Sequence, residues 1–114
     1  MSFNYNLTID QGATFSKTFT YKSGGNAVDL STHTARMMVR SSYDASSTLV
    51  SLTSAGGDIT LASNGVIVVT VSATATAALA APNSGVYDLE IVASDGTVTR
   101  LLQGNVSITP EVTK

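Results

Sequence analysis

Hydrophobic and polar residues alternate along much of this chain, and the alternation is clearest between Gly85 and Lys114. Tyr87, Leu89 and Ile91 alternate with more polar neighbours, which is the period of a strand with one face in a core and one in water. Asp95-Gly96 follows and favours a two-residue type I′ turn, because both turn positions of that type need positive φ. The segment therefore predicts a hairpin, and we take it as the scaffold on which the earlier strands build.

The rest of the chain predicts further strands separated by turn residues. Gly104 interrupts the second strand of the scaffold hairpin and predicts a bulge there. Asn64-Gly65 is a second type I′ signal, and such a turn would pair Leu61 with Val68. Ser72 is a suitable N-cap for a short helix near 73–81, rich in Ala and stopped by Pro82. The alternation places the earlier strands at residues 3–9, 14–22, 35–40, 48–53, 59–61 and 66–71.

This spacing predicts an all-β fold of about eight short strands with one short helix. Successive hairpins without long crossovers make the sheets mainly antiparallel. Two architectures fit, an immunoglobulin-like β-sandwich and a partly open barrel. A chain of 114 residues forms one domain by length, so residues 1–114 are expected to be a single β-sandwich domain.

Charge and cysteine content narrow the function classes. Charged residues make up 12% of the chain, about half of the usual ~25%, and the net charge is −2. The cations are scattered in sequence, which argues against phosphate-mediated nucleic-acid binding; they are Lys17, Lys22, Arg36, Arg40, Arg100 and Lys114. The start MSFNYNLTID has no leader pattern, no apolar run approaches the ~20 residues of a membrane helix, and cysteine is absent. We therefore expect synthesis in a cytoplasm, no membrane partner and no disulfide or thiolate metal site.

Candidate chemistry is sparse. The single histidine, His33, lies in a polar corner and is expected to be a turn residue rather than part of a triad. The aspartates stand singly at turn positions, where they serve the backbone, and no calcium-loop pattern is present. Asp88 and Glu90 share one strand face, so paired acid–base work on a glycan is conceivable, but a solvated sheet face is the favoured interpretation. We expect no enzyme activity, no catalytic residue, no metal and no cofactor.

The pattern of one strand suggests contact between subunits. Val66 to Val71 is apolar on both faces, whereas a half-exposed strand should be polar at every second position. Ile67 and Val69 on one face, and Tyr43 in a polar loop, are therefore predicted at or near subunit contacts in a homo-oligomer. The alternative is that a second sheet covers one face and the helix the other, which would leave a monomer.

Three stretches carry a resemblance to a known family: LTIDQGATFSKTFTY from Leu7, VDLSTHTARMMVR from Val28, and GVYDLEIVASDGTVTRLLQGNVSITPEVTK from Gly85. In order and spacing they resemble small virion proteins of tailed bacteriophages. The first part is also similar to the N-terminal sandwich module of phage baseplate upper proteins. The corner after Val-Asp-Leu departs from the family, because Thr32 and His33 stand where a glycine and an aromatic are common.

The resemblance implies a non-enzymatic structural protein of the virion, in the tail or baseplate, whose partners are other virion proteins. A capsid cement or decoration protein is an alternative in the same class, since that role also suits a small, weakly charged sandwich. The alternative from another class is a carbohydrate-binding host-attachment module.

Overall fold

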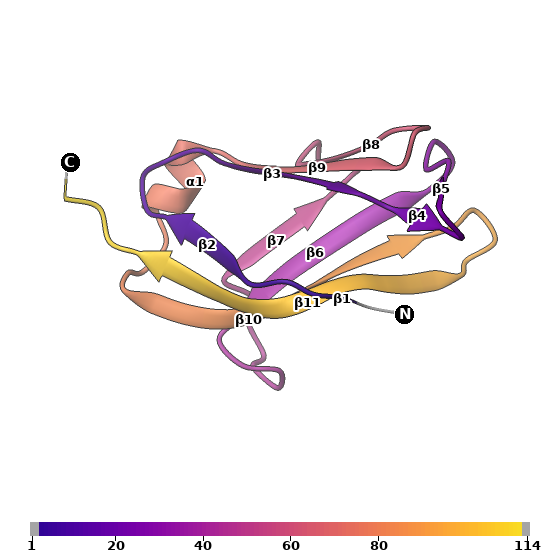
Figure 1. Cartoon of the computed structure of the whole chain (residues 1–114). Coiled ribbons are helices and arrows are strands. Elements are labelled where there is room, and N and C mark those ends of the chain that lie inside the picture. The colour runs from indigo at the N-terminus through magenta and orange to yellow at the C-terminus, as the bar shows by residue number, and fades with distance from the viewer. Residues whose placement is uncertain (1–2, 113–114) are drawn as a thin grey trace.

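The computed structural model describes residues 3–112, so Met1, Ser2 and Lys114, used above for the leader and charge arguments, lie outside it. Two sheets face each other with a short helix at one end of the gap (Figure 1). The larger sheet has six strands: β1 (Phe3–Asn4), β2 (Leu7–Asp10), β6 (Thr34–Arg40), β7 (Val50–Thr53), β10 (Asn83–Val92) and β11 (Val98–Thr109). The smaller has three: β3 (Phe15–Thr20), β8 (Ile59–Leu61) and β9 (Val66–Val71). The remaining elements are the ribbon β4 (Lys22–Ser23) with β5 (Asn26–Ala27), and the helix α1 (Ala73–Ala77).

The strand order decides between the two predicted architectures. The large sheet runs β1-β11-β10-β6-β7, with β2 also on β11, and the small sheet runs β3-β9-β8. This is the strand order of an immunoglobulin-type sandwich, with β1 and β2 added parallel to the last strand. All other pairings are antiparallel. The predicted all-β fold is confirmed, and it is a sandwich rather than a closed barrel.

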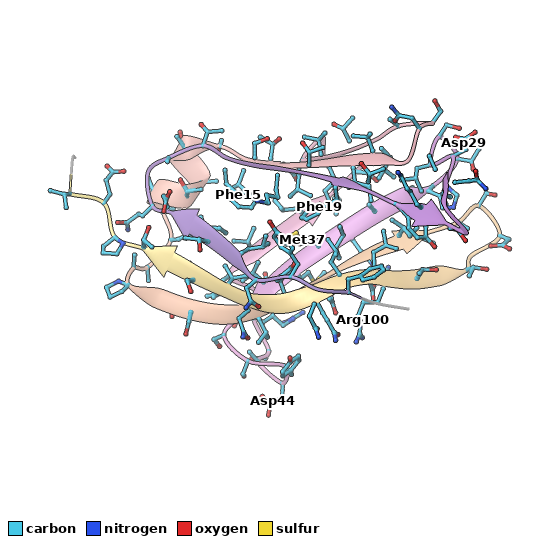
Figure 2. The ribbon with its side chains drawn as sticks, viewed as in Figure 1. Phe15, Phe19, Asp29, Met37, Asp44 and Arg100 are labelled. Atoms are coloured by element: carbon cyan, nitrogen blue, oxygen red, sulfur yellow. The ribbon has the colours of Figure 1, made fainter. Side chains whose placement is uncertain are left out.

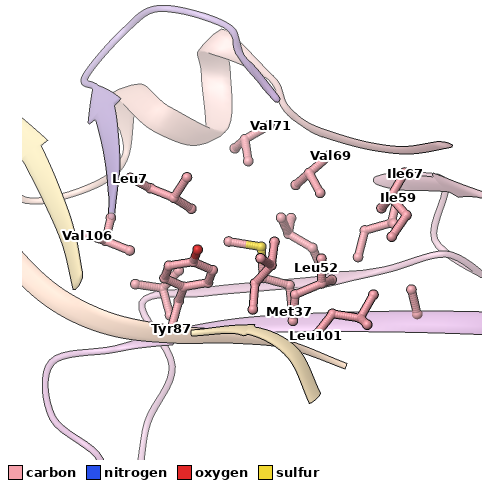
Figure 3. Packing of buried hydrophobic residues seen from close by; sticks show 14 of the residues in the cluster. Leu7, Met37, Leu52, Ile59, Ile67, Val69, Val71, Tyr87, Leu101 and Val106 are labelled. Atoms are coloured by element: carbon pink, nitrogen blue, oxygen red, sulfur yellow. The ribbon is translucent and has the colours of Figure 1, made fainter. Parts of the chain in front are cut away.

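The core lies between the sheets and follows the predicted alternation (Figure 3). In β6 the side chains of Ala35, Met37 and Val39 are buried, and their sequence neighbours point outward. The scaffold hairpin is the centre of the large sheet: β10 pairs with β11 on one side and with β6 on the other. Burial of alternate apolar side chains from both sheets is the main stabilising term of such a fold.

Both type I′ turn predictions are wrong. Gly65 and Gly96 have the expected positive φ, 81° and 91°, but no other residue type in the described chain does, so Asn64 and Asp95 do not. Each loop instead has three residues, in which a type I turn is followed by a glycine in the left-handed region. The same bond closes both turns, from Gly65 N to Ala62 O and from Gly96 N to Ala93 O. The longer loop shifts the register by one residue, and Leu61 pairs with Ile67 instead of Val68.

The predicted bulge lies elsewhere in β11. The register shifts opposite the Leu89–Glu90 step, where Leu89 pairs with Leu102 and Glu90 with Arg100. Leu101 is thus the extra residue, and both it and Leu102 are buried. Gly104 is regular in pairing, and its missing side chain instead leaves room for the backbone of Tyr5 to cross close by.

Helix α1 closes one end of the sandwich, and it is shorter than predicted. Ser72 caps it as expected, accepting from Ala75 N at 3.2 Å, but the helix stops at Ala77 rather than Ala81. The fully buried Thr76 donates from Oγ1 to Ala13 O at 2.8 Å and accepts from Gly12 N at 3.1 Å. The helix is therefore fixed to the turn between β2 and β3.

The strand that suggested an interface is explained by the fold. Ile67 and Val69 are each 1% exposed within the single chain, because both point into the core. Their argument for a subunit contact is therefore wrong. On the opposite face Val68 is half-buried between Thr18 and Thr60, its partners on the neighbouring strands.

Candidate functional site

The outer face of the six-stranded sheet gathers all three arginines of the chain. Arg36 and Arg40 come from β6 and Arg100 comes from β11, with β10 between them. We call this surface the arginine face. It comprises Arg36, Met38, Arg40, Val86, Asp88, Glu90, Arg100 and Gln103, with Tyr43 at its rim. Figure 2 shows Arg100 directed away from the small sheet, on the side where the loop bearing Asp44 projects.

Strand register arranges these side chains in rows across the sheet. One row is Arg36, Glu90 and Arg100, so Glu90 lies between two arginines. Arg36 Nε donates to Glu90 Oε1 at 2.8 Å. Opposite charges on directly paired residues stabilise a sheet by a few tenths of a kcal/mol, up to about 1 kcal/mol.

The second row is Met38, Asp88 and Gln103. Arg100 reaches diagonally into it, with Nε 3.5 Å from Asp88 Oδ2 and Nη1 3.4 Å from Gln103 Oε1. Both contacts are long for charge-assisted bonds, which are usually about 2.7–2.9 Å. The Arg100 side chain is about half exposed. It is therefore only loosely held where it lies.

Arg40 occupies the third row, paired with Val86, and positions the loop 41–49. Its Nη1 donates to Ala45 O at 2.9 Å, and Ala45 N closes a turn onto Ser42 O at 3.2 Å. Tyr43 lies within that turn and is 83% exposed. Folding of the chain leaves this ring uncovered, so it is available for contact with another molecule.

Together these groups line a shallow pocket of about 360 Å³. Its wall is charged, with three arginines against two carboxylates, while Met38 and Val86 add apolar surface between them. The face therefore has one excess positive charge on a chain whose net charge is −2. A surface of this kind can hold an anionic group and bury moderate apolar area beside it.

The sequence predicted one residue of the arginine face, Tyr43, as a contact, and it did not predict the arginines at the centre of that face. Tyr43 was predicted and lies at the rim; its role in a contact stays a prediction. Ile67 and Val69 are far from it, in the core of the other sheet. The missed arginines had one signal: Arg36 and Arg40 share the outward parity of their strand, and Asp88 and Glu90 share that of theirs.

The other candidate groups form no reactive site in the described chain. His33 is a half-buried turn residue, its N–H bonded to Leu30 O at 3.1 Å, and its Nδ1 is buried without a partner. Hydrogen bonds lower the pKa values of Asp29 and Asp95, from Ser31 to Asp29 and from the Thr97 N–H to Asp95, and the nearby His33 makes a smaller electrostatic contribution to both. Residues 3–112 contain no cluster of three potential metal ligands.

A second surface lies along the open edge between β1 and β3. The Tyr5 and Phe19 rings meet edge to face with centroids 5.6 Å apart, and Lys17 Nζ lies 5.2 Å from the Tyr5 ring centroid. Phe3 is 60% exposed beside them, over a small groove of about 180 Å³. Lys17 points inward from the edge strand β3, an arrangement that hinders pairing with another strand.

Comparison with models of protein families and with curated protein sequences found no match to this chain. Across residues 3–112, no helix has the length and apolar character that crossing a bilayer requires.

Proposed function

We propose that this chain is a non-enzymatic structural subunit of a tailed-bacteriophage particle, placed in the tail or baseplate, and that it binds neighbouring subunits through the arginine face. The particle assignment is supported by the three sequence stretches that resemble small phage virion proteins. The binding surface is supported by one structural observation, the collection of all three arginines with an exposed Tyr43 on one sheet face.

The composition of the arginine face suits a protein contact. Arginine, tyrosine and methionine are enriched at protein interfaces, and hot spots favour Tyr and Arg in particular. Arg36 and Glu90 pair within the face, so they need no partner to be satisfied. Met38 supplies exposed apolar surface among the charged groups, and Tyr43 supplies more at the rim.

The fold also fits a subunit that folds before it assembles. Its core side chains are covered inside one chain, including the apolar inner face of β9. A neighbour is therefore not needed to complete the core. Contacts made through an outer sheet face would join finished domains, as in a particle built from separately folded parts.

The particle assignment is tested by locating the chain. Particles of a phage that carries this gene are imaged by electron microscopy with and without a tagged copy, and a gene deletion is examined in parallel. We expect the tag in the tail or baseplate and defective tails in the deletion. Tags on the capsid with fragile heads would support a decoration protein instead, and intact particles lacking the chain would overturn the proposal.

The surface assignment is tested by complementation of the deletion. Arg100→Glu and Tyr43→Ala should reduce incorporation into particles, while Lys22→Glu, an exposed residue away from this face, should not. Equal incorporation of all three variants would show that neighbours bind another surface. A glycan array with the purified chain provides the remaining control, since specific glycan binding would favour host attachment.

A further inference from the structure

The arginine face has chemistry that selects its partner. We propose that it recognises a carboxylate-bearing segment of a neighbouring protein, with Arg40 and Arg100 as the binding groups and Tyr43 as the apolar contact. This inference rests on the proposed function, and it adds the chemical class of the group that the surface takes.

Arg40 has hydrogen-bonding capacity that the fold leaves unused. A guanidinium has five N–H donors, and Arg40 uses Nη1 toward Ala45 O and makes only a weak 3.6 Å contact from Nη2 to Met38 Sδ. Within residues 3–112 the ion pairs are Arg36 with Glu90 and Arg100 with Asp88, so Arg40 has no carboxylate partner there. Arg40 lines the pocket, where a carboxylate would be the best-matched acceptor for its remaining donors.

Arg100 can also bind an incoming carboxylate without losing a strong interaction. Its contacts with Asp88 and Gln103 are 3.5 Å and 3.4 Å long, and its side chain is about half exposed. An exposed pair of this kind contributes little to stability. Turning the guanidinium toward an incoming carboxylate therefore costs little.

The surroundings favour an acidic side chain on a protein over the other anionic partners. Asp88 and Glu90 leave the face only one positive charge in excess, whereas a nucleic acid carries a phosphate at every nucleotide and binds through many clustered cations, so nucleic acid is disfavoured. A second copy docking by the same face would bring two surfaces of like excess charge together. Met38, Val86 and the exposed ring of Tyr43 offer apolar contact beside the cations, which suits an acidic residue flanked by apolar ones.

The experiment uses the full chain in solution and two synthetic peptides as probes. Acetyl-Glu-Leu-Glu-Leu-Glu-amide has the proposed chemistry, and acetyl-Gln-Leu-Gln-Leu-Gln-amide is its neutral match. Binding is followed by amide shifts in NMR titrations at low and high salt. We expect saturable shifts at Met38, Val86 and Gln103 with the glutamate peptide, weakened by salt, and much smaller ones with the glutamine peptide.

Variants of the chain distinguish specific binding at the arginine face from general electrostatic attraction of the acidic peptide. Arg100 holds no loop in place. Arg100→Gln should lower the affinity for the glutamate peptide about tenfold, the value expected for losing one charge-assisted contact. Lys22→Gln removes the same charge from another surface and should change the affinity less than about twofold, as expected for screened charges. Arg40→Gln should act like Arg100→Gln, and its melting temperature checks that the loop survives.

Three results would overturn the inference: no saturable shift with the glutamate peptide, equal binding of both peptides, or equal loss in Lys22→Gln and Arg100→Gln. Binding of N-acetylneuraminic acid in place of the peptide would also overturn it, by assigning the pocket to an acidic sugar. The particle experiments are separate. A chain located in the tail that binds no carboxylate refutes this inference alone, and a carboxylate-binding chain absent from particles refutes the proposed function alone.

Discussion

At the residue scale, a single hydroxyl connects the sheet centre to the N-terminal segment. Tyr87 is buried on β10, and its hydroxyl donates to Tyr5 O at 2.6 Å, across β11. The contact depends on Gly104, because a side chain there would collide with the Tyr5 carbonyl. Gly104 thus lets the link between β1 and β2 pass close over the strand, where Tyr5 N also bonds Gln103 O at 2.9 Å.

We expect Tyr87→Phe to lower the free energy of unfolding by about 1 kcal/mol, the usual net value of one hydrogen bond. Urea denaturation measures it. Tyr21→Phe is the control, since within residues 3–112 the Tyr21 hydroxyl makes no hydrogen bond, and it should change stability by less. An equal loss in both variants would refute the role of the Tyr87 bond.

The same tyrosine gives the fold an alkaline limit. Burial, with a smaller contribution from Tyr5, raises the pKa of Tyr87 from 10.0 to about 12. Between these values the unfolded chain loses the proton and the folded chain keeps it, so stability is complete below pH 10 and falls toward pH 12. Thermal unfolding across this range should show a steeper decline for the parent chain than for Tyr87→Phe, and parallel curves would contradict the assignment.

At the element scale, two hairpins have the same type of three-residue loop, but the neighbours of the two loop glycines differ. Gly65 and Gly96 each end a three-residue loop with positive φ, and Asn64 and Asp95 each accept from the N–H two residues later. Gly96 lies in open space. At Gly65 a side chain would meet Tyr21 O at 2.5 Å and the Val28 backbone at 3.2 Å.

We expect Gly96→Ala to cost about 1–2 kcal/mol, the cost of a left-handed conformation for an L-residue. Gly65→Ala should cost more, because the same strain is joined by a backbone collision. Chemical denaturation of the two variants side by side tests this directly. Equal losses would mean that the neighbouring segment 21–28 yields without cost.

The edge strand β3 illustrates protection against association. Lys17 points inward toward Tyr5, so a strand added at this edge would have to displace or bury a charge. Lys17→Val should therefore promote concentration-dependent self-association, measured by light scattering. Thr18→Val adds an apolar residue to the outward face of the same strand and should not. Monomeric behaviour of Lys17→Val at high concentration would refute the protective role.

At the scale of the whole molecule, folding and assembly use different surfaces. The core lies between the two sheets, and the arginine face lies outside the larger one. Mutations in the core should therefore change stability, and mutations on the arginine face should change binding. Truncating a core residue such as Ile67 should affect the fold, and truncating the exposed Tyr43 should affect only what the fold binds.

We expect Ile67→Ala to cost about 2–5 kcal/mol, as for other buried aliphatic truncations, while leaving the arginine face intact. Tyr43→Ala should leave the melting temperature nearly unchanged and reduce incorporation into particles. Calorimetry and the complementation assay measure the two effects. A lower melting temperature for Tyr43→Ala would contradict its role as a binding residue. An unchanged melting temperature for Ile67→Ala would contradict its role in the core.

The sequence by itself determined the elements and the direction of their side chains. Alternation of apolar and polar residues is a local property of one strand, so it correctly placed Tyr87, Leu89 and Ile91 in the core and Asp88 and Glu90 on the outer face. The turn glycines were recognisable for the same reason, since positive φ is a demand on one residue. For the candidate site, the sequence pointed to Tyr43 in its polar loop and missed the arginines.

Only the tertiary structure decided what depends on strands far apart in sequence. It set the loop length that pairs Leu61 with Ile67, and it covered Ile67 and Val69 with the second sheet. It also brought Arg100 beside Glu90, across from Arg36, and made a pocket from scattered charges. The physical reason is that the pairing of distant strands is fixed by packing between the sheets, which no local pattern contains.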